Sequence, residues 1–221
     1  MAPMLPTQVT ELFDDVLSSR RLLTHRFYRR WEAGTLGDGE LSAYAAQYRH
    51  FEATLPAVLE NVVTAVDDGP ARALVQANLD DERGVPVPHI DLFDRFAAAL
   101  GAPATPPSPA MASLVSLYLS LADTDPAAAV AAVCAYEVQS PAIAVSKAAG
   151  LRAHYGLDES ATEFWDVHGK VDETHGRWMV EALAALAPDA AAVSGPAVAA
   201  ADAWWQFLDE REAQASIAPV C

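Results

Sequence analysis

Three side chains that bind metal ions in many proteins recur at helical spacing in the C-terminal half of the chain: His168, Asp172 and His175. At about 100° per residue, positions i, i+4 and i+7 of a helix lie within roughly 60° of arc, so the three share one face. Apolar residues such as Trp165 and Met179 lie nearby on that face, so the set is expected to point inward. An isolated ionised carboxylate in an apolar interior needs a cation, and a metal ion supplies one. A self-contained cluster of histidine and aspartate hydrogen bonds is the alternative.

A second pair of potential ligands, Glu82 and His89, lies in the segment DERGVPVPH. Pro86 and Pro88 exclude a continuous helix between them, because each lacks a backbone donor and clashes with the preceding turn. One helix is therefore expected to end near Gly84 and another to begin near His89. A surface turn with a solvated glutamate is the alternative for this segment taken alone.

A lone carboxylate, Glu137, follows a run of alanine, valine and cysteine and is expected to be buried. With it, three histidines and three carboxylates form a nitrogen and oxygen ligand set that suits iron or manganese. Two divalent ions fit three carboxylates better than one, because their four positive charges leave a slight excess. Zinc hydrolysis is disfavoured because there is no HExxH motif, and the paired Glu-x-x-His motifs of ferritin-like proteins are absent.

The elements that must position these ligands are helices. Apolar residues recur every three or four positions over long stretches, and no alternating run of strand length is found. Seven or eight helices are expected, in an all-α bundle that forms one domain over residues 1–221. The predicted ranges are Leu12–Phe27, Leu41–Val66, Arg72–Glu82, His89–Leu100, Met111–Leu121, Ala127–Lys147, Ala161–Leu186 and Ala197–Glu212.

The charge, the apolar stretches and the cysteine spacing indicate which partners and which cellular compartment to expect. The net charge of −16 and the lack of basic runs argue against nucleic acid. The N-terminus does not read as a secretory signal, and the longest apolar stretch, Ala127–Tyr136, is short of the roughly 20 residues that span a bilayer. The two cysteines, Cys134 and Cys221, have no metal-binding or redox spacing. We expect a cytoplasmic protein without a membrane partner or a structural disulfide.

The ligand pattern resembles that of the haem-oxygenase-like diiron oxidases, which have Glu-x6-His, a lone Glu, and then His-x3-Asp-x2-His. Here these are Glu82-x6-His89, Glu137 and His168-x3-Asp172-x2-His175. The resemblance implies a dimetal centre, Fe/Fe or Fe/Mn, that activates O2 with electrons from an external reductant. It leaves the substrate open.

A narrower resemblance covers nearly the whole chain and points to the family of the chlamydial protein associating with death domains. It rests on HRFYRRWEAGTL, AYAAQY, NLDDERGVPVPHIDLF, YEVQSPAIAVSK and WWQFLDE. The family implies self-sacrificing synthesis of para-aminobenzoate, the folate precursor. By motif, Tyr28 would become the aromatic product, Lys147 would donate its nitrogen, and Tyr136 would be a second tyrosine of the site. On the residues alone, Tyr28 could equally be a core aromatic and Lys147 a solvated residue near a helix end.

Two other functions stay open at this point. One is a multiple-turnover oxidase that acts on a free small amine, amino acid or fatty acid in the same bundle. The other is a metal-free binding protein in which the polar set only forms hydrogen bonds. The adjacent Trp204 and Trp205 are consistent with a homodimer interface if they are exposed, or with packing inside the bundle.

Overall fold

The computed structural model describes residues 4–84, 87–186 and 189–215. Within these ranges the chain has ten α-helices and one short 3-10 helix, and no strand. The predicted all-α class is confirmed. The elements are α1 (Pro6–Leu17), η1 (Leu22–Thr24), α2 (Arg26–Glu32), α3 (Asp38–Ala65), α4 (Pro70–Arg83), α5 (His89–Ala99), α6 (Pro109–Thr124), α7 (Pro126–Glu137), α8 (Ser140–Tyr155), α9 (Glu159–Leu186) and α10 (Ala190–Ala215).

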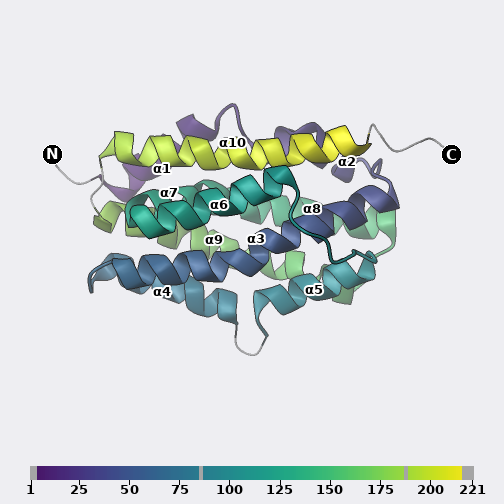
Figure 1. The fold of residues 1–221 in the computed structure, drawn as a ribbon, viewed down its shortest axis with the longest axis horizontal. Coiled ribbons are helices and arrows are strands. Elements are labelled where there is room, and N and C mark those ends of the chain that lie inside the picture. The colour runs from purple at the N-terminus through teal and green to yellow at the C-terminus, as the bar shows by residue number, and fades with distance from the viewer. Residues whose placement is uncertain (1–3, 85–86, 187–188, 216–221) are drawn as a thin grey trace.

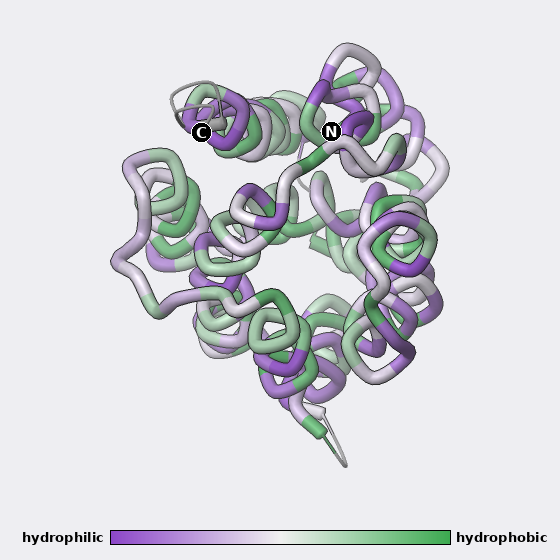
Figure 2. The backbone as a smooth tube through the Cα atoms, turned by 90° about the vertical axis from the view of Figure 1, so that its right-hand side faces the viewer, coloured by the Kyte–Doolittle hydropathy of each residue, from purple (hydrophilic) through white to green (hydrophobic). Residues whose placement is uncertain are grey.

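The long helices α3, α9 and α10 run along the long axis of the molecule (Figure 1). Viewed end on, the helices surround a common centre (Figure 2). Large aromatic side chains fill this centre, and those of Tyr44, Tyr48, Trp165 and Trp204 are each at most 2% exposed. The site residues predicted from the sequence are therefore carried by helices that face one aromatic core.

The predicted helix Leu12–Phe27 is wrong, because the structure divides it into α1, η1 and α2. Phe13 and Leu17 are four residues apart, as are Leu23 and Phe27, so helical apolar spacing is found on both sides of the break. A new helix starts at His25, whose Nδ1 accepts a hydrogen bond from the backbone N–H of Phe27 at 3.1 Å. This cap fixes the first turn of α2, the short helix that carries Tyr28.

The predicted helix Ala127–Lys147 is also interrupted, after Glu137. Pro141 has no N–H to donate to a carbonyl one turn earlier, so it is tolerated only in the first turn of a new helix, α8. Glu137 consequently ends α7, while Lys147 projects from a separate helix. The two interruptions account for ten helices where about eight were predicted.

The break between Glu82 and His89 is confirmed. Helix α4 ends at Arg83, Gly84 has φ of 55°, and α5 begins at His89. Pro86 lies outside the described residues. Because only glycine adopts such a φ readily, Gly84 lets the chain turn between the two side chains of the pair.

The stretch Pro126–Tyr155, which contains α7 and α8, is long and apolar enough to be a candidate membrane span, with a mean hydropathy of 1.4. The run Ala127–Tyr136 alone did not indicate this. In the bundle, 78% of that apolar window is buried, so it serves as core packing.

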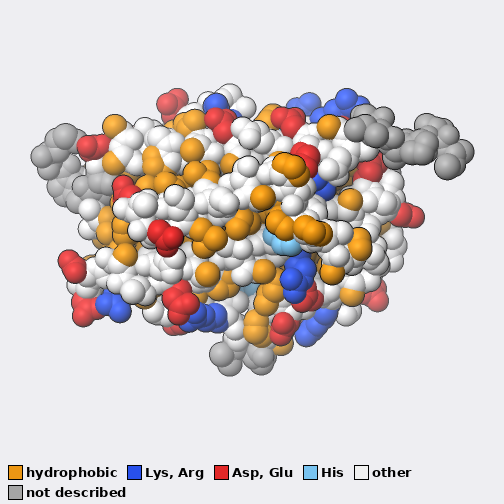
Figure 3. All heavy atoms as spheres, in the orientation of Figure 1, with side chains coloured by type: hydrophobic (Ala, Val, Ile, Leu, Met, Phe, Trp, Pro, Cys, Tyr) orange, Lys and Arg blue, Asp and Glu red, His pale blue; other side chains and the backbone are white. Residues whose placement is uncertain are grey.

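The face drawn in Figure 3 carries scattered acidic side chains among apolar ones.

Of the two alternatives for the tryptophan pair, packing inside the bundle holds for Trp204, which is 1% exposed and stacks on Tyr136 with ring centroids 4.5 Å apart. Its neighbour Trp205 is half-buried against His25, with ring centroids 4.8 Å apart. The tryptophan pair thus belongs in part to the core.

Cys134 is buried with a free thiol, and Cys221 lies outside the described residues.

The turn after α4 generates a test of the fold. A Cβ at Gly84 would collide with the backbone carbonyl of Val87, whereas one at Gly101, which has φ of 61°, would meet nothing within 4 Å. Gly84→Ala is expected to lower the free energy of unfolding by about 1–3 kcal/mol more than Gly101→Ala does, in urea titrations of the two variants. Equal losses would show that the contact with Val87 is unimportant.

Candidate metal centre

The structure brings the six predicted ligands into the interior of the bundle. Each is at most 7% exposed, although four different helices supply them. The alternative of a solvated glutamate at the α4–α5 turn is wrong, because Glu82 is 4% exposed. The ligand candidates are Glu82 on α4, His89 on α5, Glu137 on α7, and His168, Asp172 and His175 on α9.

Glu82, His89 and His168 form a compact group. One potential ligand atom from each lies within 4.8 Å of the other two. Oε2 of Glu82 is 3.2 Å from Nδ1 of His89, and the two imidazole rings have centroids 4.5 Å apart. Two nitrogen atoms and one oxygen atom at this spacing can ligate a single divalent ion.

In His168 and His175 of α9, a hydrogen bond at one ring nitrogen determines which nitrogen remains to face the centre. Nδ1 of His168 donates to the backbone carbonyl of Phe164 at 2.7 Å, which leaves Nε2 as the ligand atom. Nε2 of His175 donates to Oδ2 of Asp81 at 3.2 Å, which leaves Nδ1. Hydrogen bonds of this kind orient the histidines of metal sites.

Two of the imidazole nitrogens are buried without a hydrogen-bond partner: Nδ1 of His89 and Nδ1 of His175. Nδ1 of His175 lies 3.5 Å from Oδ1 of Asp172 and 3.7 Å from Oε1 of Glu82. These distances are too long for a good hydrogen bond but leave room for an ion between the three atoms. A buried, unsatisfied donor set of this composition fits a metal centre.

Glu137 extends the group toward the α7–α8 turn. Its two carboxylate oxygens accept hydrogen bonds from Nδ2 of Asn78 at 2.9 and 3.1 Å. Burial raises the pKa of Glu137 well above its usual range, and the neighbouring Asp172 raises it further. The single amide therefore does not replace the solvation that the carboxylate has lost.

The pKa values show which groups lack a compensating charge. Burial raises the pKa of Asp172 to about 8, and burial lowers that of His168 to about 3. Burial also acts to raise the pKa of Glu82, but the contact with His89 outweighs it and the pKa is lowered. His168 is thus a neutral imidazole, the form that ligates metal, and the carboxyl groups would ionise fully beside added cations.

A further buried carboxyl group, not among the residues predicted from the sequence, is Glu52 on α3, which is 4% exposed. Burial, then Glu82 and Asp172, raise its pKa well above the usual range, while a hydrogen bond with Tyr48 opposes the rise. A signal was present, because Tyr44, Tyr48 and Glu52 stand at i, i+4 and i+8 of one helix. Glu52 therefore lies between the metal-binding set and the tyrosines of α3.

Tyr28 and Lys147 lie together in the interior of the bundle. The hydroxyl of Tyr44 is 2.8 Å from that of Tyr28 and accepts a hydrogen bond from Nζ of Lys147 at 2.6 Å. Nζ is also 4.7 Å from the centroid of the Tyr28 ring. Both residues are 1% exposed, so the alternative of a solvated Lys147 is wrong.

The surroundings of the amine are aromatic. Nζ of Lys147 lies 4.7 Å from the centroid of the Tyr48 ring and 4.0 Å from that of Trp165. Burial lowers the pKa of Lys147 well below its usual range, although Glu52 opposes this. The hydroxyl of Tyr48 contacts that of Tyr136, the residue before Glu137. The phenols thus connect the amine with the α7 end of the metal-binding set.

Solved structures share this fold. A TenA homologue from Pseudomonas syringae superposes with a TM-score of 0.82 at 14% identity, over 95% of this chain and 96% of its own. A CADD-like protein of unknown function from Nostoc punctiforme gives a TM-score of 0.75 at 20% identity, over 93% of this chain and 97% of its own. At these identities the likeness concerns the fold alone.

Proteins that are similar in sequence say more about the family than the shared fold does. A protein of Chlamydia pneumoniae named 4-aminobenzoate synthase is 31% identical over 91% of this chain and 94% of its own. One of the same name from Nitrosomonas europaea is 34% identical over 89% of this chain and 87% of its own. The family model for iron-containing redox enzymes matches residues 42–209, which include all six ligand candidates. The chain therefore belongs to the family of iron-containing redox enzymes.

Proposed function

We propose that this enzyme makes 4-aminobenzoate from its own Tyr28, with Lys147 as the amine donor and a dimetal centre as the oxidant. The centre would hold two iron ions, or one iron and one manganese, and would use O2 and an external reductant. The observation that carries the proposal is the contact between Nζ of Lys147 and the ring of Tyr28, with 4.7 Å from the nitrogen to the ring centroid. The names of the sequence relatives support the product.

The product can be compared with the tyrosine side chain atom by atom. Both contain a benzene ring with one carbon substituent and one heteroatom in the para position. Conversion requires cleavage of the Cα–Cβ bond, oxidation of Cβ to a carboxyl group, and replacement of the phenol oxygen by nitrogen. The ring itself is kept, so a tyrosine beside an amine already holds the required parts.

The amine is held in a reactive form. A lysine acts as a nucleophile only when it is neutral, and burial favours the neutral form of Lys147. Its hydrogen bond to Tyr44 directs Nζ toward the hydroxyl end of Tyr28, because the hydroxyl of Tyr44 contacts both groups. Tyr44 therefore positions the donor at the end of the ring that receives nitrogen.

The ligands proposed for the two ions are Glu82, His89, Glu137, His168, Asp172 and His175. When bound, the metal ions would reduce O2 and so supply the oxidising power that the cleavage of a tyrosine side chain needs. Asn78, Asp81 and the carbonyl of Phe164 hold three of these ligands by the hydrogen bonds described above. The buried aromatic wall around Lys147 excludes water from the amine and the ring.

The role of the hydrogen bond from His175 to Asp81 can be tested by removing its acceptor. Asp81→Ala removes the acceptor that orients His175 and is expected to weaken metal binding by about 10- to 100-fold. The matched control is Asp80→Ala, because Asp80 is the preceding exposed residue and its carboxylate accepts a hydrogen bond from Gln76, on its own helix. Anaerobic titration with Mn²⁺, followed by electron paramagnetic resonance, measures both affinities. Equal affinities would remove Asp81 from the account.

The source of the carbon and nitrogen atoms is testable with the reconstituted protein. After anaerobic loading with Fe²⁺, with and without Mn²⁺, admission of O2 and reductant should release 4-aminobenzoate and remove the Tyr28 side chain. Tandem mass spectrometry measures the loss. Tyr28→Phe should abolish product while keeping the metal, and Tyr118→Phe, at a buried tyrosine that hydrogen-bonds Ala132 and Trp204, should keep both.

The chain has two lysines, Lys147 and Lys170, which simplifies the nitrogen test. Protein labelled with ¹⁵N at the lysine ε-nitrogen should give labelled product. The label should persist in Lys170→Met, since Lys170 is exposed, and should vanish with the product in Lys147→Met. Sustained O2 consumption by Tyr28→Phe, with turnover of a free amine, amino acid or fatty acid, would instead establish a multiple-turnover oxidase.

A further inference from the structure

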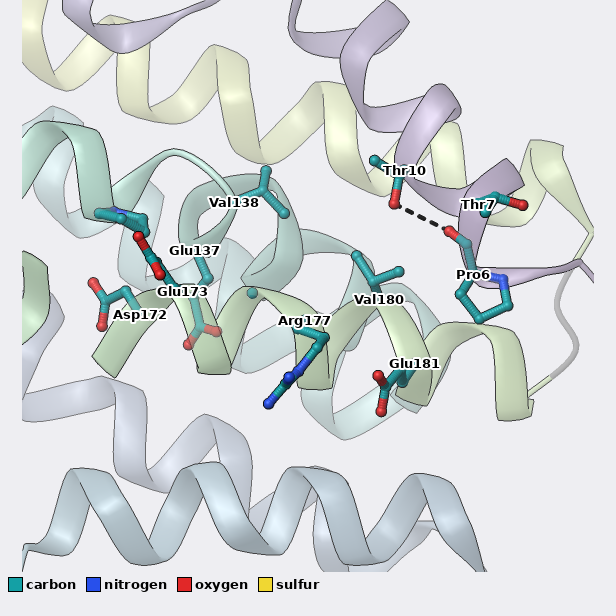
Figure 4. Close-up of a pocket in the computed structure, with 12 residues that line it drawn as sticks. Pro6, Thr7, Thr10, Glu137, Val138, Asp172, Glu173, Arg177, Val180 and Glu181 are labelled. Atoms are coloured by element: carbon teal, nitrogen blue, oxygen red, sulfur yellow. Dashed lines mark hydrogen bonds between the residues drawn. The ribbon is translucent and has the colours of Figure 1, made fainter. Parts of the chain in front are cut away.

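A groove of about 450 Å³ lies between α1 and α9 and ends at the α7–α8 turn (Figure 4). Thr7 and Thr10 of α1 form one wall, and both are exposed. Gly176 of α9 lines the opposite wall, where a Cβ would lie 3.4 Å from the backbone of Glu137. The absence of a side chain at this position lets the α7–α8 turn pack closely against α9 at the groove.

The inner end of the groove is formed by two ligand candidates, Glu137 and Asp172. Each is only 3% exposed. Behind Asp172, the unpartnered Nδ1 of His175 lies 3.5 Å from Oδ1 of the aspartate. The groove therefore leads to buried potential ligand atoms, one of which has no hydrogen-bond partner among the described residues.

The mouth of the groove favours cations. Glu173, Arg177 and Glu181 stand one turn apart on α9 and all line it, so carboxylates outnumber the single guanidinium. In Figure 4, Glu137 and Asp172 lie at one end of the row of lining residues and Glu181 at the other, with Arg177 between them. A cleft with acidic walls raises the local concentration of cations, and the overall charge of −16 acts in the same direction. An anionic aromatic acid would be repelled.

We propose that this groove is the passage through which divalent metal ions reach the centre, with Glu173 and Glu181 attracting the hydrated ion and Glu137 and Asp172 receiving it. The inference rests on the proposed dimetal centre. It assigns a role to Glu173, which is exposed, and Glu181, which is half-buried; the chemistry at Tyr28 uses neither.

The test measures the rate of metal uptake rather than activity. Metal-free protein is mixed anaerobically with Fe²⁺ or Mn²⁺ at low ionic strength, quenched with chelator at set times, desalted and analysed for metal content. The double variant Glu173→Gln/Glu181→Gln should load several-fold more slowly than the natural protein, and added salt should reduce the difference. Thr10→Trp, which places a bulky side chain in an exposed wall, should also load more slowly. All variants should reach the same final metal content.

The control Asp67→Asn/Glu159→Gln removes two negative charges from exposed positions outside the groove. It should load at nearly the natural rate. Equal rates in all variants, or equal slowing in the control, would overturn the passage while leaving the dimetal centre intact. Failure of the natural protein to take up any metal would overturn the centre itself, and the passage with it.

Discussion

Four carboxyl groups share the interior of this bundle: Glu52, Glu82, Glu137 and Asp172. Burial of a carboxylate is unfavourable without a cation, and here each of the four also faces another carboxyl group. Contacts with three histidines, His89 above all, lower the pKa of Glu82, but the pKa values of the other three are raised. The two divalent ions that we propose would supply the positive charge that these carboxyl groups need.

Burial favours the neutral form of both the carboxyl groups and the amine, but the chemical consequence differs between them. It drives the carboxyl groups toward their neutral form and so increases their need for metal, while it also keeps the amine of Lys147 neutral. Burial is the main cause of the lowered pKa of Lys147, and the charge of Glu52 opposes it. A metal-binding pocket and a nucleophilic amine can therefore lie in one dry core, separated by Glu52 and the tyrosines of α3.

Much of this was predictable from sequence, for identifiable reasons. The spacing of His168, Asp172 and His175 and the prolines after Glu82 fixed the helices that carry the ligands, because helical periodicity and proline geometry are local properties. The helix ends near Leu22 and Pro141 were missed where apolar spacing continued by coincidence across a break. Tyr28 and Lys147 were indicated by family resemblance, not by periodicity.

The remaining features depend on contacts between distant parts of the chain. Asn78 and Glu137 are 59 residues apart, and Asp81 and His175 are 94 apart, so no local pattern predicts their hydrogen bonds. Glu52 lies on an amphipathic helix that also carries exposed charged residues such as Arg49 and Glu60, so its burial was not apparent from the sequence. Its position in line with Tyr44 and Tyr48 became informative only once those tyrosines were seen beside Lys147.

The central claim is that the buried carboxylates and histidines hold two metal ions. Crystals grown from anaerobically loaded protein, with diffraction data collected at the iron and manganese absorption edges, test it most directly. Two anomalous peaks are expected, both within ligand distance of the set formed by Glu82, His89, Glu137, His168, Asp172 and His175. A single peak, or none at this set in fully loaded protein, would contradict the account.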